Sequence, residues 1–391
     1  MKLYTPAFIA LFFANLAHVA SFGAFFLFPL YITGHGGTSQ DIGIIMGAFS
    51  LASALLRPWV ANMIDRLGPK HSYSIGCGIL AVMPLTHLWC IGPIQDYYPL
   101  LLLIRVVHGI GLAICFTAVF TFVIDFIPVA RLNEGIGIFG SSGLVGIALG
   151  PLVTEPFIKL YGETALFFVA ALLATLAFLF QLPVRPPCQR SIDHAATPGF
   201  FSLLRTRKLF ICACLSLLFG IGLAATGNFI APYAEEKQLS FISLYYLAYS
   251  CAAIAVRFTL GRLADRIGEN RIIPWGLMIA AGGLLFTPLV NGNILLLVVG
   301  FIFGIGHGLL FPSLNSMAIR GVPYAIRGKI TGIFTGGIDS GVFLGALVLG
   351  VIGRAYGFTI LFLCAGVLIL SGLLLFRLAP RQMSKTAQIG Q

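Results

Sequence analysis

Twelve apolar runs, each about as long as a bilayer is thick, divide this chain. A helix needs roughly 20 apolar residues to cross the hydrocarbon core of a membrane. Short polar loops separate most runs, which lie at about 5–33, 40–64, 72–92, 98–125, 134–158, 163–182, 208–232, 240–264, 272–290, 294–319, 329–352 and 358–378. We therefore expect an all-α integral membrane protein with twelve transmembrane helices. The first run is counted as a span because it is too long for the apolar part of a signal peptide.

The composition argues against several other classes of protein. Charged residues make up 9% of the chain and hydrophobic residues 58%, whereas a soluble domain has about 25% charged residues. A net charge of +11 would indicate a nucleic-acid partner in a soluble protein. Here the basic residues lie in short loops between apolar runs, so no nucleic acid is expected. The eight cysteines show no paired spacing, so we expect neither a disulfide framework nor a metal or other cofactor.

Lysines and arginines are divided unequally between the two sides of the predicted bundle. Eighteen of the 24 lie near the termini, in the even-numbered loops or in and beside the connector 183–207, and the odd-numbered loops contain only Lys159, Lys237 and Arg354. Basic loops stay on the cytoplasmic side of a membrane. We therefore expect a multi-pass protein of the plasma (inner) membrane, with both termini and the connector in the cytoplasm.

The chain also contains an internal repeat. The turn Asp-Arg-Leu-Gly at 65–68 returns as Asp-Arg-Ile-Gly at 265–268, and an offset of 195 aligns the Gly-Ile-Gly at 109–111 with that at 304–306. A pattern that recurs at half the chain length indicates two related halves, and transporters built from repeats have their site between the repeats. We expect an N-terminal six-helix bundle at 1–182, a cytoplasmic linker at 183–207 and a C-terminal six-helix bundle at 208–391.

These motifs resemble those of the major facilitator superfamily, and the resemblance covers the whole chain. The repeated turn is similar to the family's loop signature Gly-x-x-x-Asp-Arg-x-Gly-Arg-Lys. The second copy matches the first glycine with Gly261, whereas the first copy has Ala61 there and keeps Lys70 as its closing basic residue. Arg105, followed four positions later by Gly109, is similar to the signature of the family's fourth helix.

The run 134–158 resembles the drug and metabolite:proton antiporter branch of that family, which consists largely of exporters. Gly137, Gly146 and the pair Gly150-Pro151 follow the spacing of that branch, although residues 154–155 are Thr-Glu where the pattern closes with Gly-Gly. Whatever the family, small residues allow close contact between helices in lipid, and a proline allows a helix to bend.

The resemblance implies two pseudo-symmetric six-helix bundles around a central cavity, alternating access and, in most members, proton coupling. It also implies that the charged turns form a latch in the outward-open state. The alternative is that each turn is only a solvated, capped loop. The predicted gating residues are Asp65, Arg66, Lys70, Asp125, Asp265, Arg266, Gly146, Gly150 and Pro151.

Asp339 lies near the middle of an apolar run. An ionisable group at membrane depth is a functional-site candidate. We expect Asp339 to carry the coupled proton or to contact the substrate. Alternatively, it pairs with Arg57, Arg105 or Arg257, the three arginines inside the runs. Arg105 is itself a candidate for gating or coupling, because its charge persists at any working pH.

Three histidines and two asparagines complete the predicted set for proton coupling and substrate binding. They lie in runs that line the cavity in this family. Histidine titrates near neutral pH and can relay protons, although a lone histidine in an apolar helix is more often simply hydrogen-bonded. These residues are His18, His108, His307, Asn15 and Asn228.

The functional hypothesis is a secondary active transporter for the proton-coupled efflux of a small amphipathic organic compound. Few fixed charges and many aromatic side chains in the predicted lining favour such a substrate. The alternative is a proton-coupled importer of a carboxylate or a sugar. We find no nucleophile–base pair for a membrane enzyme, so no catalytic residue is predicted. The expected partners are the substrate, protons and the lipid bilayer, and the expected state is a monomer.

Overall fold

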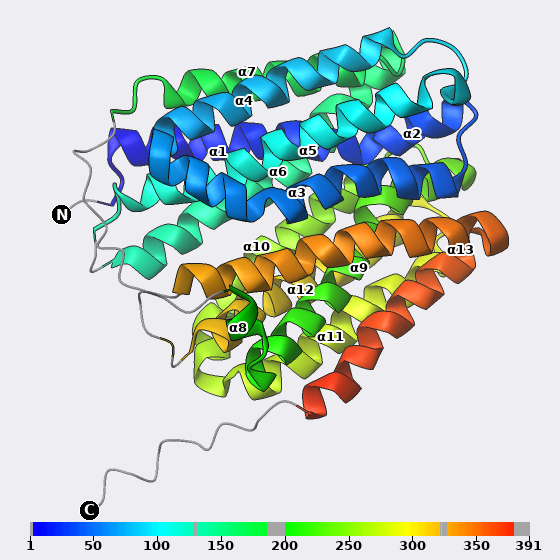
Figure 1. Ribbon diagram of the computed structural model, residues 1–391. Helices are drawn as coiled ribbons and strands as arrows, with labels where there is room; N and C mark the ends of the chain where they lie inside the picture. Colours follow the sequence, from blue (N-terminus) through cyan, green and yellow to red (C-terminus); the bar gives the residue numbers. More distant parts are fainter. Residues whose placement is uncertain (1–2, 129–130, 186–199, 321, 323–326, 379–391) are drawn as a thin grey trace, which may run out of the picture.

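The computed structural model describes residues 3–128, 131–185, 200–320, 322 and 327–378, and this part of the chain contains helices and no strands. The long helices run side by side in two groups (Figure 1). Their bounds are α1 Pro6–Ala24, α2 Phe28–Gly34, α3 Ser39–Leu67, α4 Pro69–Thr86, α5 Ile94–Ile124, α6 Leu132–Tyr161, α7 Ala165–Gln181, α9 Arg207–Glu236, α10 Ser243–Ile267, α11 Glu269–Phe286, α12 Asn293–Ile319 and α13 Arg327–Arg377. A short helix, α8 Phe200–Leu204, precedes α9.

The helices account for the twelve predicted spans. A 3-10 turn at Phe25–Leu27 joins α1 and α2 into the first span, and α13 contains the last two spans, because the backbone leaves helical geometry at Gly357 with φ 80°. By length and hydropathy alone, eight helices of the described residues are able to cross a membrane, and α13 is one of them. The predicted all-α fold with twelve membrane helices is therefore confirmed.

The repeated turn has the same backbone in both copies. Gly68 (φ 80°, ψ 156°) separates α3 from α4, and Gly268 (φ 83°, ψ 155°) separates α10 from α11. A positive φ is costly for a residue with a Cβ and free for glycine. The turn requires a glycine as its last residue, because only this backbone conformation connects one long helix directly to the next, antiparallel helix.

Glycines also set the distance between helices within each half. A Cβ on Gly146 would lie 2.7 Å from the carbonyl oxygen of Leu16, and a Cβ on Gly150 would lie 2.5 Å from the amide nitrogen of Ala24, so α6 touches the backbone of α1. In the other half, a Cβ on Gly341 would lie 2.8 Å from the carbonyl carbon of Leu217, so α13 touches α9 in the same way. The pseudo-symmetry therefore extends to helix packing.

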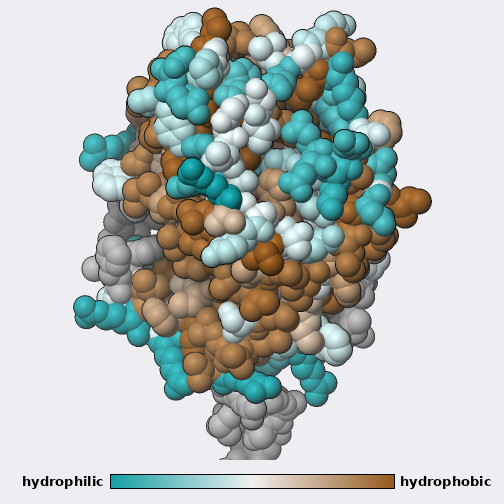
Figure 2. Space-filling model, turned by 90° about the vertical axis from the view of Figure 1, so that its right-hand side faces the viewer, coloured by the Kyte–Doolittle hydropathy of each residue, from teal (hydrophilic) through white to brown (hydrophobic). Residues whose placement is uncertain are grey.

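The two ends of the bundle differ in how the halves meet. We call the end with the N-terminus, the repeated turns and α8 the connector end, and the opposite end the distal end (Figure 1). At the distal end Arg354 donates a hydrogen bond to Gln40 over 2.6 Å, and Phe26 stacks on Tyr246 with ring centroids 5.0 Å apart. Figure 2 looks onto this end, where hydrophilic side chains gather over the upper part of the surface.

Candidate functional site

An ion pair between α3 and α13 joins the two halves. Arg57 on α3 approaches Asp339 on α13, with Nε 2.7 Å and Nη2 2.5 Å from the same carboxylate oxygen, Oδ2. The two side chains are 26% and 21% exposed. Of the three arginines considered as partners for Asp339, the structure therefore selects Arg57, which comes from the other half of the chain.

Arg257 on α10 occupies the position in the second copy of the repeat that Arg57 occupies in the first. Arg57 and Arg257 each lie ten positions before the last residue of their helix, which corresponds to about 15 Å along the axis. Arg257 reaches toward the N-terminal half, where its Nη1 is 3.7 Å from the point that a Cβ on Gly140 would occupy. Among the described residues no carboxylate lies within ion-pair distance of Arg257, and its Nε has no hydrogen-bond partner.

Arg105 is enclosed within the N-terminal half. Its side chain is almost fully buried, and its guanidinium carbon lies 4.4 Å from the centroid of Phe49 and 5.0 Å from that of Phe25. It also approaches Nδ1 of His108 at 3.2 Å and donates to the sulfur of Met46 at 3.4 Å. A cation–π contact attracts the charge without needing a carboxylate, so the surroundings of Arg105 are aromatic and lie within one half.

The three predicted histidines are buried inside their own halves. Nδ1 of His18 is 3.1 Å from the hydroxyl of Tyr73, and the ring of His108 packs against Phe25 at 4.6 Å. His307 is hydrogen-bonded to the hydroxyl of Tyr249. The contacts described for these rings come from the same half as the histidine, so their place in the structure fits the hydrogen-bonded alternative better than an open cavity wall.

The two predicted asparagines are also buried. Nδ2 of Asn15 donates to the hydroxyl of Ser142 over 2.6 Å and thereby links α1 to α6, while its Oδ1 has no partner in the described structure. Asn228 on α9 has an unpartnered Nδ2. Neither residue contacts the Arg57–Asp339 pair.

A second link between the halves lies at the distal end and was not predicted. The carboxylate of Glu155 on α6 accepts hydrogen bonds from the backbone amides of Ile242 (3.0 Å) and Ser243 (2.8 Å), at the first turn of α10. One turn further along α6, Lys159 pairs with Glu155 at 2.9 Å and donates to the carbonyl of Ser240. A carboxylate is favoured at a helix N-terminus by the unsatisfied amides and the helix dipole.

Glu155 and Lys159, which we call the clamp, are the two residues that sequence reasoning missed. In the sequence, Thr154 and Glu155 stand out only as a departure from the closing Gly-Gly of the antiporter pattern. The available signal was an acidic residue in an apolar helix one turn before a lysine. An acid at that depth is a functional candidate in its own right.

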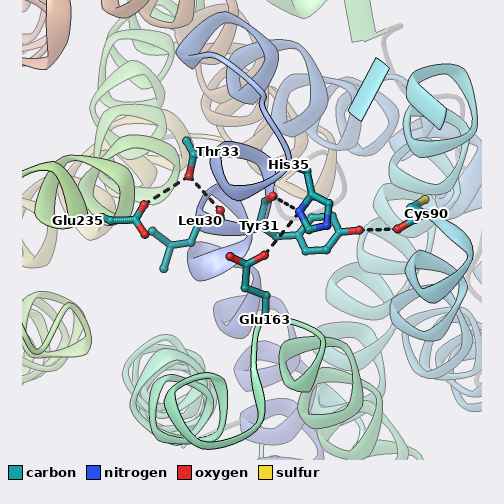
Figure 3. Close-up of polar contacts among 7 residues, drawn as sticks. All are labelled: Leu30, Tyr31, Thr33, His35, Cys90, Glu163 and Glu235. Atoms are coloured by element: carbon teal, nitrogen blue, oxygen red, sulfur yellow. Dashed lines mark hydrogen bonds and ion pairs between the residues drawn. The ribbon is translucent and has the colours of Figure 1, made fainter. Parts of the chain in front are cut away.

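A polar cluster of Thr33, His35, Glu163 and Glu235 brings the two halves together at the distal end (Figure 3). Nδ1 of His35, which ends α2, is 3.5 Å from Glu163 in the loop between α6 and α7. Thr33 lies within 3.4 Å of Glu235 from the other half. Partial burial raises the pKa of Glu163, and the nearby charge of Glu235 adds to this effect while His35 opposes it.

The first copy of the predicted gating turn, Asp65 to Lys70, forms no side-chain hydrogen bond or ion pair with described residues of the C-terminal half. Asp65 and Arg66 are exposed, and Asp65 has no ion pair or hydrogen bond among the described residues. Lys70 donates to the carbonyls of Leu182 (2.9 Å) and Val184 (2.7 Å) in its own half. Asp125 is exposed at the C-cap of α5.

The second copy of the turn can be placed only by its backbone. The helical backbone of Asp265 and Arg266 belongs to α10, but their side chains lie outside the described part of the chain. Gly146 and Gly150 pack α6 on α1 as described above, and Pro151 lies buried within α6.

The described residues contain no cluster of histidine, cysteine or acidic side chains able to hold a metal ion. A groove of about 420 Å³ runs between α6 and α7, lined by Val153, Phe157, Tyr161, Thr164, Ala165, Phe168, Val169, Leu172 and Leu173. No charged side chain lines it. The polar contacts that join the halves, and not this groove, therefore form the candidate site.

Comparison with known proteins agrees with this architecture. The sequence model of the Major Facilitator Superfamily matches residues 10–335 and 242–391. The staphylopine export protein of Staphylococcus aureus is 23% identical over 87% of this chain and 87% of its own length. The quinolone resistance protein NorA of the same organism is 24% identical over 82% and 83%. The crystal structure of the nucleoside transporter NupG superposes with a TM-score of 0.72 at 17% identity, over 95% of this chain and all (100%) of NupG.

The membrane-spanning helices, the internal repeat and the family match identify a multi-pass membrane transporter and not an enzyme. The chain belongs to the Major Facilitator Superfamily, since the family model covers most of its length.

Proposed function

We propose that this protein is a proton-coupled exporter of a small amphipathic organic compound. It works as a monomer in the plasma (inner) membrane, with both termini and the connector end in the cytoplasm. The observation that carries this proposal is the Arg57–Asp339 pair, in which Nε of Arg57 lies 2.7 Å from Oδ2 of Asp339 in the other half. Relatives named for staphylopine export and quinolone resistance support the direction of transport.

The pair provides a coupling device because it exists only while Asp339 is ionised. A proton on Asp339 removes the charge that holds Arg57, so the proton and the link between the halves are alternatives. A ligand shifts a conformational equilibrium only by binding one state better than the other. On this account a proton bound from outside accompanies the carrier back to the inward-facing state, and reformation of the pair expels it into the cytoplasm.

The contacts at the two ends support an inward-facing conformation. At the distal end, assigned to the cell exterior by the distribution of lysine and arginine, the clamp and the Arg354–Gln40 bond hold the halves together. At the connector end Lys70 bonds its own half, and Arg320 pairs with Glu269 within the other half over 2.7 Å. The predicted latch of the charged turn would then close in the opposite, outward-open state.

A second candidate is a proton-coupled importer of a small carboxylate. Arg257, which has no carboxylate near it among the described residues, favours this reading, because a substrate acid would supply the missing charge. The two candidates differ in the direction of the gradient that each one needs.

The test uses inverted membrane vesicles that contain the full chain, with a fluorescent quinolone as the probe. An exporter accumulates the quinolone when the vesicle interior is acidic, and a protonophore abolishes the accumulation. A control preparation carries the vector without the gene. Equal accumulation in both preparations, or accumulation that ignores the protonophore, contradicts proton-coupled export. Uptake of a carboxylate by right-side-out vesicles in acidic medium would instead support the importer.

A further inference from the structure

Arg257 is a mostly buried cation that has no partner charge in the described part of the chain. Its guanidinium lies 5.4 Å from the ring centroid of Phe311 on α12, and Nε has no acceptor. Tyr249 and His307 are close enough to interact with it electrostatically, but neither is an anion at neutral pH. A buried charge is costly unless it is paired and hydrogen-bonded, and a ring satisfies only one face of a guanidinium.

The internal repeat makes the missing partner conspicuous. On one side of the interface between the halves, Arg57 is neutralised by Asp339. On the other side the residue that faces Arg257 is Gly140, which has no side chain to offer. Within the described residues, these two positions therefore contain two cations and one anion, and the surplus positive charge is on Arg257.

We propose that Arg257 binds an acidic group of the transported compound, so that the substrate is an amphipathic organic anion. This inference rests on the proposed transport function and specifies its substrate class. A guanidinium matches the geometry of a carboxylate or a phosphate with two parallel hydrogen bonds. The ring of Phe311, which packs edge-on against Phe334 at 5.1 Å, offers an apolar surface next to the charge.

The charge count has a consequence for the direction of transport. The empty carrier has one surplus positive charge at this interface, and a monoanion bound to Arg257 cancels it. The loaded carrier then moves outward as a neutral unit, and the empty, positive carrier returns inward. An inside-negative membrane potential acts on every charge that crosses, so it favours export of the anion in addition to any contribution from protons.

The test compares three probes of one shape: 2-naphthoate, 2-naphthamide and 2-naphthylmethylammonium. Binding of each to the purified full-length protein is measured by equilibrium dialysis, without any proton gradient. We expect wild type to bind the naphthoate at least tenfold more tightly than the amide, a typical gain for a charge-assisted hydrogen bond, and to bind the ammonium most weakly. Arg257→Gln should remove the preference for the acid and leave binding of the amide unchanged, while Arg257→Lys should retain part of it.

Arg377→Gln is the matched control, because it removes an exposed arginine at the last residue of α13 and should keep the preference for the acid. The inference is wrong if wild type binds none of the probes, binds acid and amide equally or prefers the ammonium. It is equally wrong if Arg257→Gln keeps the preference. These outcomes concern binding alone, so they are separate from a failure of gradient-driven quinolone export, which would contradict the proposed function.

Discussion

Glu155 accepts a hydrogen bond from the backbone amide of Ser243 over 2.8 Å, and this bond ties α6 of one half to the first turn of α10 of the other. A carboxylate that caps a helix of the opposite half holds the distal end closed through contacts that can be broken and formed again. The bond is made only where the halves meet and is lost as soon as they separate. It therefore gives a direct way to change the balance between the two access states.

Glu155→Gln should loosen the distal end. The glutamine side chain has one acceptor oxygen and no negative charge, so it cannot replace both hydrogen bonds of the carboxylate. The loss of a hydrogen bond to a charged group costs about 1–3 kcal/mol. Ile242, now buried, should become accessible, so Ile242→Cys in a cysteine-free background should react several-fold faster with a thiol reagent in the Glu155→Gln protein. Glu134→Gln, a change at an exposed acid of the same helix, serves as control. Unchanged reactivity would mean that the clamp does not hold the closed state.

The polar cluster at the distal end predicts a pH dependence. Burial raises the pKa of Glu163 above the ordinary value of 4.5, so the closed distal end binds this proton more tightly than an open one would. Closure should therefore be favoured as the external pH falls toward that raised pKa and should weaken as the pH rises through it. The other ionisable groups facing Glu163 are His35, which opposes this rise in its pKa, and Glu235, which adds to it.

This dependence is measured as the distance between spin labels on Trp89→Cys and Leu289→Cys, two exposed positions at the distal ends of the two halves. Acidification should shorten the distance in the otherwise unchanged protein. The shift should be reduced by Glu163→Gln but not by Glu236→Gln, a change in an exposed neighbour of Glu235. A response that is identical in both variants would rule out Glu163 as its source.

Gly150→Ala should destabilise the N-terminal half. The added Cβ would lie 2.5 Å from the amide nitrogen of Ala24, and backbone cannot move aside as a flexible side chain can. Forcing extra volume into a packed interface costs about 1–3 kcal/mol. Gly137→Ala is the matched control in the same helix, because open space surrounds its Cβ position. Thermal unfolding of the purified proteins should show a lower midpoint for Gly150→Ala alone, and equal midpoints would contradict the close packing.

Arg105→Met separates a packing role for Arg105 from a functional one. The arginine is buried among aromatic rings, and no described carboxylate pairs with it. Apolar replacement of buried charges is often neutral or stabilising. We expect an unchanged or higher unfolding midpoint together with reduced transport, because methionine cannot supply the permanent charge that a role in gating or coupling needs. A variant with normal transport would assign Arg105 to packing only.

The sequence predicts the helices well but not the directions of their side chains. The predicted run 98–125 and α5, Ile94–Ile124, agree within four residues at each end, because the bilayer fixes the length of an apolar run. The repeat predicts the turn at Gly268 from the turn at Gly68. The depth of His18 also follows from its position in the run. Which neighbour its ring faces depends on the rotation of α1 against α4, which no local pattern specifies.

The same limit applies to the links between the halves. The apolar surroundings of Asp339 identify it as unusual, but the choice among Arg57, Arg105 and Arg257 depends on how two bundles dock over hundreds of residues of sequence separation. Glu155 is hard to predict because the family pattern specifies a glycine at this position and contains no information on a charged contact. Its partners are backbone amides, which have no sequence signature.

The measurement that tests the central claim most directly is gradient-driven export by Asp339→Asn. In inverted vesicles with an acidic interior, the variant should not accumulate the quinolone. Exchange of quinolone across the vesicle membrane without a gradient should survive, because the folded carrier still alternates between its inward-facing and outward-facing states. Asp96→Asn, at an exposed acid near the distal end, should behave as wild type. Accumulation at the wild-type rate in Asp339→Asn would show that the coupled proton is carried elsewhere and would contradict the account.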